Sequence, residues 1–124
     1  MSSATKDRTR RLFQGADRGR LTTVAGVGYR NGVPAREAPS GWTLGVVRRP
    51  DGDLIVCDYW GHRIWRIDRE GILHLFGGDG VAGTRGDGGD VAQARFREPH
   101  DLALDHHGNL FLSDLGNQTY RRID

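Results

Sequence analysis

The segment DGDLIVCDYWGHRIWRID, residues 51–68, recurs 56 residues later as HGNLFLSDLGNQTYRRID, residues 107–124. Six of the eighteen aligned positions are identical, and both copies contain a run of consecutive apolar residues, at 54–57 and at 110–113. Recurrence at a fixed period is the sequence signature of repeat architectures, in which each unit buries its apolar surface against its neighbours. The sequence therefore predicts a repeat architecture.

Two flanking segments repeat as well. The segment GRLTTVAGVG, residues 19–28, aligns with GILHLFGGDG, residues 71–80, at a shift of 52. The segment NGVPAREA, residues 31–38, aligns with DGGDVAQA, residues 87–94, at a shift of 56. The difference of four residues lies in the loop at 80–85, and a repeat fold tolerates an insertion of this kind.

Each repeat is predicted to form short strands separated by glycine-containing turns. The expected strands are 44–47, 54–57, 62–67 and 72–76 in the first copy, 102–104, 110–113 and 118–123 in the second, and 20–25 upstream. The consecutive apolar runs predict strands buried on both faces. The segments 62–67 and 118–123 mix polar and apolar residues and are expected to be more exposed. No long helical period occurs, so few helices are expected.

Four antiparallel strands per unit, repeated every 40–55 residues or so, indicate blades of a β-propeller. The predicted fold is all-β, a partial propeller of about two four-stranded blades. It comprises a strand at 20–25, a complete blade at 44–76 and an incomplete blade at 102–124. Residues 1–18, which are rich in arginine, are predicted to be a flexible basic segment that precedes the blades.

The repeats also resemble a known family. Residues 99–124, PHDLALDHHGNLFLSDLGNQTYRRID, resemble the NHL repeat with its G-N-L-Y/F-V-A/S-D core. LTTVAGVG and GDGGDVAQA are similar to the linking segments of bacterial NHL proteins. The resemblance covers residues 19–124 and implies a six-bladed propeller, related to YWTD and gluconolactonase-like propellers. In the first copy, Thr43 replaces a proline and Tyr59-Trp60-Gly61 replaces the usual turn.

Composition narrows the class of protein. The 124 residues suit one domain, and 36% hydrophobic with 27% charged residues indicates a soluble protein without membrane interaction. The single cysteine, Cys57, excludes an internal disulfide framework. No signal peptide is visible in residues 1–20, so a cytoplasmic location is expected. The net charge of +2 is too small to indicate nucleic-acid binding by itself.

The glycine-rich stretch GGDGVAGTRGDGGD, residues 77–90, contains three motif-like patterns. Its G-x-G-x-x-G spacing would need a following helix to bind a dinucleotide, and none is predicted. Its aspartates, Asp79, Asp87 and Asp90, are irregularly spaced for a calcium loop. The stretch also contains an Arg-Gly-Asp tripeptide. We expect a bend between blades, in which glycines permit positive φ.

The candidate binding residues are His100, Asp101 and Trp42. Inner strands of a propeller line its central channel, and Pro99-His100-Asp101 begins such a strand. In peptidylglycine-lyase relatives a histidine at this place ligates zinc, so the resemblance implies His100 as a metal candidate with Asp101 at the active site. The first copy has Leu44 and Gly45 at the aligned positions, and neither can supply a second ligand.

Other recurring polar residues are expected to be structural. Asp58 and Asp114 follow the buried strands and are predicted to accept turn N–H groups. Arg66 and Arg122 are predicted to pair with carboxylates. Tryptophans 42, 60 and 65 suit either a recognition surface or packing between blades.

The predicted function is that of a non-catalytic binding or scaffold module for protein recognition, without a cofactor. The alternative is a fragment of a metal-dependent lyase or lactonase-type hydrolase, with zinc or calcium and with His100 and Asp101 at the channel. A third hypothesis is RNA binding through the N-terminal arginines. The expected partners are a protein or further propeller blades, and a homotrimer would complete a six-bladed ring.

Overall fold

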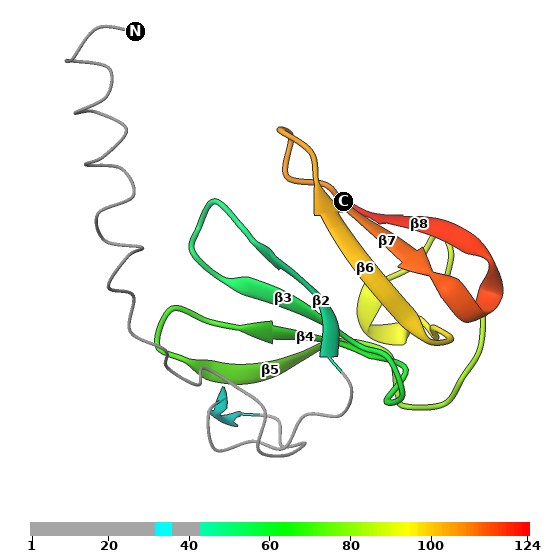
Figure 1. Cartoon of the computed structure of the whole chain (residues 1–124), viewed down its shortest axis with the longest axis horizontal. Helices are drawn as coiled ribbons and strands as arrows, with labels where there is room; N and C mark the ends of the chain where they lie inside the picture. Colours follow the sequence, from blue (N-terminus) through cyan, green and yellow to red (C-terminus); the bar gives the residue numbers. More distant parts are fainter. Residues whose placement is uncertain (1–31, 36–42) are drawn as a thin grey trace, which may run out of the picture.

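The computed structural model describes residues 32–35 and 43–124, which form two antiparallel β-sheets (Figure 1). Two 3₁₀ turns lie wholly within these residues, η3 at Val91–Gln93 and η4 at Leu115–Asn117, and Ala35 also has 3₁₀ conformation. None of the described segments is a helix long and apolar enough to cross a membrane. The predicted strand at 20–25 and the candidate residue Trp42 lie outside the described part of the chain.

The first sheet contains five strands in the order β1-β5-β4-β3-β2. The last four follow one another in the chain as an antiparallel meander, as predicted, and their bounds lie within two residues of the expected ones. The strands are β1 at Val33–Pro34, β2 at Thr43–Arg48, β3 at Leu54–Asp58, β4 at Arg63–Ile67 and β5 at Ile72–Gly77.

The short strand β1 was not among the strands expected from the sequence. Val33 pairs with Leu73 and Pro34 with Ile72, so β1 covers the outer edge of β5. A two-residue strand that contains proline gives no alternating pattern in the sequence, and proline is compatible with such an edge position. The strand β5 is therefore paired along both of its edges, with β4 and with β1.

The second sheet contains three strands in the order β6-β7-β8. These are β6 at Pro99–Leu104, β7 at Leu110–Asp114 and β8 at Thr119–Ile123. The repeat is visible in backbone geometry as well as in sequence. Gly52 and Gly108, at equivalent positions of the two inner turns, have φ of 97° and 88°, a conformation that favours glycine.

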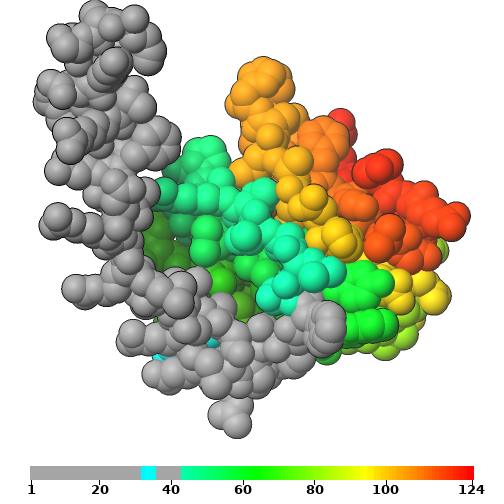
Figure 2. Space-filling view, in the orientation of Figure 1, coloured from blue at the N-terminus to red at the C-terminus, as the bar shows by residue number. Residues whose placement is uncertain are grey.

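The two sheets pack face to face through one apolar core. Its buried members come from β3 and β4, from β6 and β7, and from the connecting loop: Ile55, Cys57, Ile64, Leu102, Leu110, Leu112, Ala94 and Phe96. The inner strands β2 and β6 lie side by side (Figure 2). Stacked antiparallel sheets with adjacent inner strands confirm the predicted all-β fold of partial propeller blades.

Burial differs between the two copies, and it differs from expectation in the strands β7 and β4. The strand β3 is buried on both faces, as predicted, but its counterpart β7 leaves Phe111 42% exposed. The strand β4 was expected to be more exposed, and that expectation is wrong. Ile64 packs in the inter-sheet core, whereas Trp65 and Ile67 pack in a second cluster on the other face of the first sheet.

The glycine-rich stretch forms the bend between the sheets, as predicted. Only the single 3₁₀ turn η3 follows it, capped by the Asp90 carboxylate, which accepts the Ala92 N–H. The Asp79 carboxylate pairs with Arg95 at 2.8 Å, and Asp87 pairs with Arg121 at 2.8 Å. Gly86 has φ of 112° and lies against Ala94, a site where a side chain would be strained. These ion pairs and the Asp90 cap thus hold the stretch in its turn conformation.

Replacing Gly45 with valine is expected to destabilise the protein by about 1–3 kcal/mol. A Cβ on Gly45 would lie 2.8 Å from Asp101 Cα and 2.9 Å from the His100 carbonyl oxygen, so β2 and β6 would have to separate. Chemical unfolding measures the change. Thr43→Val, at an exposed position of the same strand, is the control and should change stability by less than about 0.5 kcal/mol. Equal stability of the two variants would contradict the close approach.

Candidate functional site

The inner strands of the two sheets are closest at the start of β6. Here the backbone of His100 and Asp101 lies against Gly45 of β2. Both candidate side chains are exposed, and the Asp101 carboxylate accepts the N–H of Leu102 at 2.9 Å. The structure therefore brings two of the three predicted binding residues to an accessible edge between the sheets.

The turn between β3 and β4 reaches the same edge. The ring of Tyr59 lies edge-on to the ring of His100, with centroids 6.2 Å apart, and edge-on to Trp60 at 4.8 Å. Trp60 is 56% exposed. The tripeptide Tyr59-Trp60-Gly61, which departs from the usual turn of the repeat, thus places two aromatic rings beside a predicted site residue.

The carboxylate of Glu98 joins this group from the linker. The Tyr59 hydroxyl donates to Glu98 Oε2 at 3.1 Å. Partial removal from water raises the pKa of the Tyr59 phenol, and the hydrogen bond to the negative Glu98 raises it further. Tyr59 therefore stays protonated at neutral pH and acts as a hydrogen-bond donor, not as a base.

Two residues at this edge adopt an unusual backbone conformation. His62 and Glu98 have φ of 52° and 53°, the left-handed region that non-glycine residues seldom occupy. The Glu98 N–H donates to His62 Nδ1 at 3.0 Å and connects the two strained residues across the sheets. Backbone strain of this kind costs about 1–3 kcal/mol and persists where surrounding contacts fix it, often at functional positions.

We define the junction cluster as Tyr59, Trp60, His62, Glu98 and His100. Its chemistry is that of aromatic faces, two imidazoles and one carboxylate, all drawn from the β3–β4 turn and the start of β6. Among residues 32–35 and 43–124 there is no group of three histidine, cysteine, aspartate or glutamate side chains placed to hold a metal ion. The arrangement suits contact with a partner surface.

Asp58 and the two recurring arginines have the predicted structural contacts, whereas Asp114 accepts a backbone N–H of the linker and not one of the turn that follows it. Asp58 accepts the Gly61 N–H at 3.0 Å and Asp114 accepts the Arg97 N–H at 2.7 Å, and both carboxylates are fully buried. Arg66 pairs with Asp53 at 2.8 Å and Arg122 with Asp124 at 3.5 Å. Of the two described tryptophans, Trp65 is buried and donates to Asp58, which leaves Trp60 as the accessible one.

The junction cluster was only partly visible in the sequence. His100 followed from its place at the start of an inner strand. Tyr59 and Trp60 carried a signal, since they interrupt the repeat pattern, but the pattern does not say whether such a change alters packing or creates a surface. The hydrogen bond between His62 and Glu98 joins residues 36 positions apart. It depends on positive φ angles that neither residue type predicts.

Cys57 is expected to resist alkylation in the folded protein. Burial and the nearby carboxylates of Asp101, Asp114 and Asp58 raise the pKa of its thiol to about 12, so at pH 8 about one thiol in ten thousand is the reactive thiolate. Iodoacetamide labelling followed by mass spectrometry should give full modification only in denaturant. The double variant Cys57→Ser with Ser113→Cys moves the thiol to the equivalent, half-buried position of β7 and should label faster. Rapid labelling of the folded native chain would contradict the structure.

A longer plant protein is similar in sequence to this chain. No protein-family model matches the sequence. The chain is 33% identical over 116 residues to the Arabidopsis thaliana protein SUPPRESSOR OF QUENCHING 1, chloroplastic, a match that covers 92% of this chain and 11% of that protein. It therefore spans about a tenth of the length of this relative.

Two solved structures from Bacteroides thetaiotaomicron are similar. An auxiliary nutrient binding protein superimposes with a TM-score of 0.69 at 26% identity, over 87% of this chain and 30% of that one. A structural genomics protein of unknown function superimposes with a TM-score of 0.70 at 21% identity, over 79% of this chain and 26% of that one. Each match covers less than a third of the solved structure, so this chain corresponds to one part of a larger structure.

Proposed function

We propose that this chain is a propeller-type binding module that recognises a protein partner through the junction cluster. The observation that carries the proposal is the exposed Trp60, held edge-on by Tyr59 beside His100 at the edge where the two sheets meet. Tryptophan and tyrosine dominate the binding energy of protein interfaces, because they bury large areas at little entropic cost.

Hydrogen bonds join the turn that carries Trp60 to the linker. Glu98 is held by the Tyr59 hydroxyl on one side and by His62 on the other. An aromatic anchor on a fixed turn loses little freedom when it binds, so more of its contact energy is realised as affinity. One similar solved structure is described as a nutrient binding protein, which supports a binding role.

A peptide selection tests the proposal. Peptides enriched from a random displayed library on the native chain should bind the Trp60→Ala variant at least about 10-fold more weakly. Tyr120→Ala is the matched control, since Tyr120 is 87% exposed on the other sheet, away from the junction cluster, and its loss should leave affinity unchanged. Titration with labelled peptides gives the dissociation constant of each variant and of the native chain. Equal affinity for Trp60→Ala and the native chain would contradict the proposal.

A further inference from the structure

A histidine that accepts a hydrogen bond joins the β3–β4 turn to the linker between the sheets. The backbone N–H of Glu98, in the linker, donates to His62 Nδ1 at 3.0 Å. A ring nitrogen accepts a hydrogen bond while it carries no proton, so this contact requires the neutral imidazole with its proton on Nε2. The connection between the turn and the linker therefore depends on the charge of His62.

Protonation of His62 would remove the acceptor and set two N–H groups against each other. Among residues 32–35 and 43–124, the Glu98 N–H has no other hydrogen-bond acceptor. The contact is partly buried, and an N–H group that loses its acceptor in such a place is costly to keep there. The Glu98 backbone is therefore expected to move away from a charged His62.

Backbone strain and side-chain contacts would carry this movement to the exposed aromatic rings. His62 and Glu98 both have positive φ, a conformation that persists where surrounding contacts fix it, and their mutual hydrogen bond is one such contact. The Glu98 carboxylate also accepts the Tyr59 hydroxyl at 3.1 Å, and the Tyr59 ring lies against Trp60. Release of Glu98 therefore loosens the support of Trp60.

Three parts of the chain surround His62: its own turn, the linker, and the start of the glycine-rich bend, where Gly78 lies against the His62 carbonyl oxygen. Partial removal from water and Glu98 raise the pKa of Tyr59, and the hydrogen bond to Arg95 lowers that of Asp79. Histidine is the side chain whose charge ordinarily changes between pH 5 and 8. The titratable and charged residues of these parts and of the adjoining strand ends are Asp58, Tyr59, His62, Arg63, Asp79, Arg97, Glu98 and His100.

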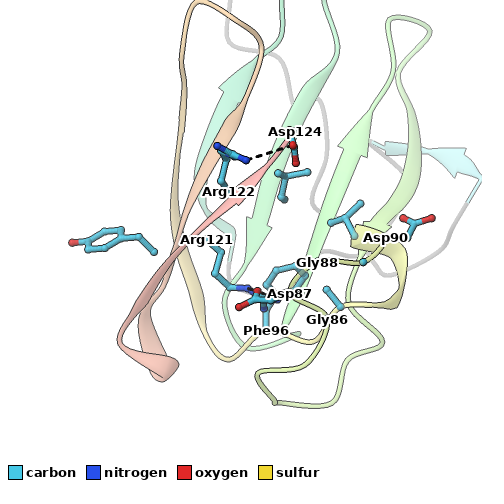
Figure 3. Close-up of a pocket in the computed structure, with 13 residues that line it drawn as sticks. Gly86, Asp87, Gly88, Asp90, Phe96, Arg121, Arg122 and Asp124 are labelled. Carbon is cyan, nitrogen blue, oxygen red and sulfur yellow. Dashed lines mark hydrogen bonds and ion pairs between the residues drawn. The ribbon is translucent and has the colours of Figure 1, made fainter.

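The other carboxylates of the bend lie at a separate place. Figure 3 shows Asp87 and Asp90 with Arg121 around a hollow beside β8, and no residue of the junction cluster lines this hollow. Asp87 pairs with Arg121 at 2.8 Å, and Asp90 caps η3. These carboxylates are thus engaged within the bend, away from His62.

We infer that His62 is a pH-sensitive positioning residue, whose protonation releases Glu98 from the β3–β4 turn and weakens binding at the junction cluster. The effect on binding rests on the proposed function, whereas the release of Glu98 is a property of the chain itself. The hydrogen bond is complete above the pH range in which histidine titrates, and it is lost as the pH falls through that range. Acidification therefore favours the released state.

The second repeat supplies a variant that fits the same backbone. Gln118 is equivalent to His62 at the shift of 56 and has φ of 56°, compared with 52° for His62. A glutamine side chain has a carbonyl oxygen that accepts a hydrogen bond at any pH. His62→Gln should therefore keep the connection to Glu98 and lose its dependence on pH.

Two further histidine variants show which imidazole is responsible. His74→Gln is the matched control, because His74 bonds to Asp68 at 2.7 Å on β5, outside the junction cluster. His100→Gln removes the other histidine of the cluster. The response of Glu98 to pH should persist in both variants, and its loss in His100→Gln with retention in His62→Gln would overturn the assignment to His62.

Nuclear magnetic resonance of the native chain tests the release of Glu98 directly. Coupling across the hydrogen bond, between the Glu98 amide nitrogen and His62 Nδ1, should be present at pH 8 and absent at pH 5. The protection factor of the Glu98 amide against hydrogen exchange should fall by at least about 10-fold over the same range. A protection factor that stays constant, or that falls equally in His62→Gln, would overturn the inference.

Peptide affinity tests the consequence for binding. Peptides selected on the native chain at pH 8 should bind at least about 5-fold more weakly at pH 5.5, relative to the same comparison in His62→Gln, an effect of the size of one hydrogen bond. Trp60-dependent peptides without this difference would overturn the effect on binding. Peptides indifferent to Trp60→Ala would instead contradict the proposed function, whereas a Glu98 amide indifferent to pH contradicts the present inference whatever the peptides do.

Discussion

Replacing Asp114 with alanine is expected to destabilise the protein by about 3–5 kcal/mol. The carboxylate is fully buried and satisfies three donors from different parts of the chain. It accepts the Arg97 N–H at 2.7 Å, the Asn117 side-chain N–H at 2.8 Å and the Arg121 guanidinium at 3.5 Å. Its removal leaves these groups without their acceptor in a dry site, which costs more than the hydrogen bonds contribute in net terms.

Denaturant unfolding followed by circular dichroism measures this loss. Asp87→Ala is the matched control, because Asp87 pairs with the same Arg121 but is 84% exposed. Exposed ion pairs contribute at most about 1 kcal/mol, so the control should remain close to the native chain. If the two variants lost equal stability, Asp114 would not be the buried anchor that the structure shows.

Replacing Phe96 with alanine is expected to cost about 3–5 kcal/mol as well. Phe96 is 1% exposed and lies in the linker between the blades, where it packs in the core that both sheets share. The Arg121 guanidinium lies 5.0 Å from its ring centroid. Its truncation would leave a cavity at the contact between the blades, and the surrounding strands cannot close it without losing their pairing.

The same unfolding measurement applies, with Phe111→Ala as the control. Phe111 belongs to β7 but is 42% exposed on the open face of the second sheet, so its loss should cost less than half as much. Reversed effects of the two phenylalanines would mean that the sheets do not pack through the face described here.

The strands could be predicted from the sequence because the repeat supplies each one twice. The turn glycines and the apolar runs recur in register, so an ambiguous segment such as 62–67 is placed by its equivalent at 118–123. Burial could be predicted less well, because it depends on neighbours. Trp65 and Phe111 both lie in strands that are paired along both edges, yet Trp65 is covered by Ala35 and Leu73, whereas Phe111 is 42% exposed.

The junction cluster depends on contacts that the repeat does not encode. His62 and Gln118 are equivalent and share a positive φ, but His62 alone meets Glu98, because only the first blade has a following blade among the described residues. Position in the stack, and not residue type, therefore decides the role of His62.

The stacking of consecutive repeats as adjacent blades is tested most directly by nuclear Overhauser spectroscopy across the inner strands. A Cβ on Gly45 would lie 2.8 Å from Asp101 Cα, so the Hα protons of Gly45 and Asp101 should give a strong cross-peak, alongside the peaks expected between β2 and β3. Intact peaks within each sheet, with none between β2 and β6, would show that the two repeats fold but do not stack as blades.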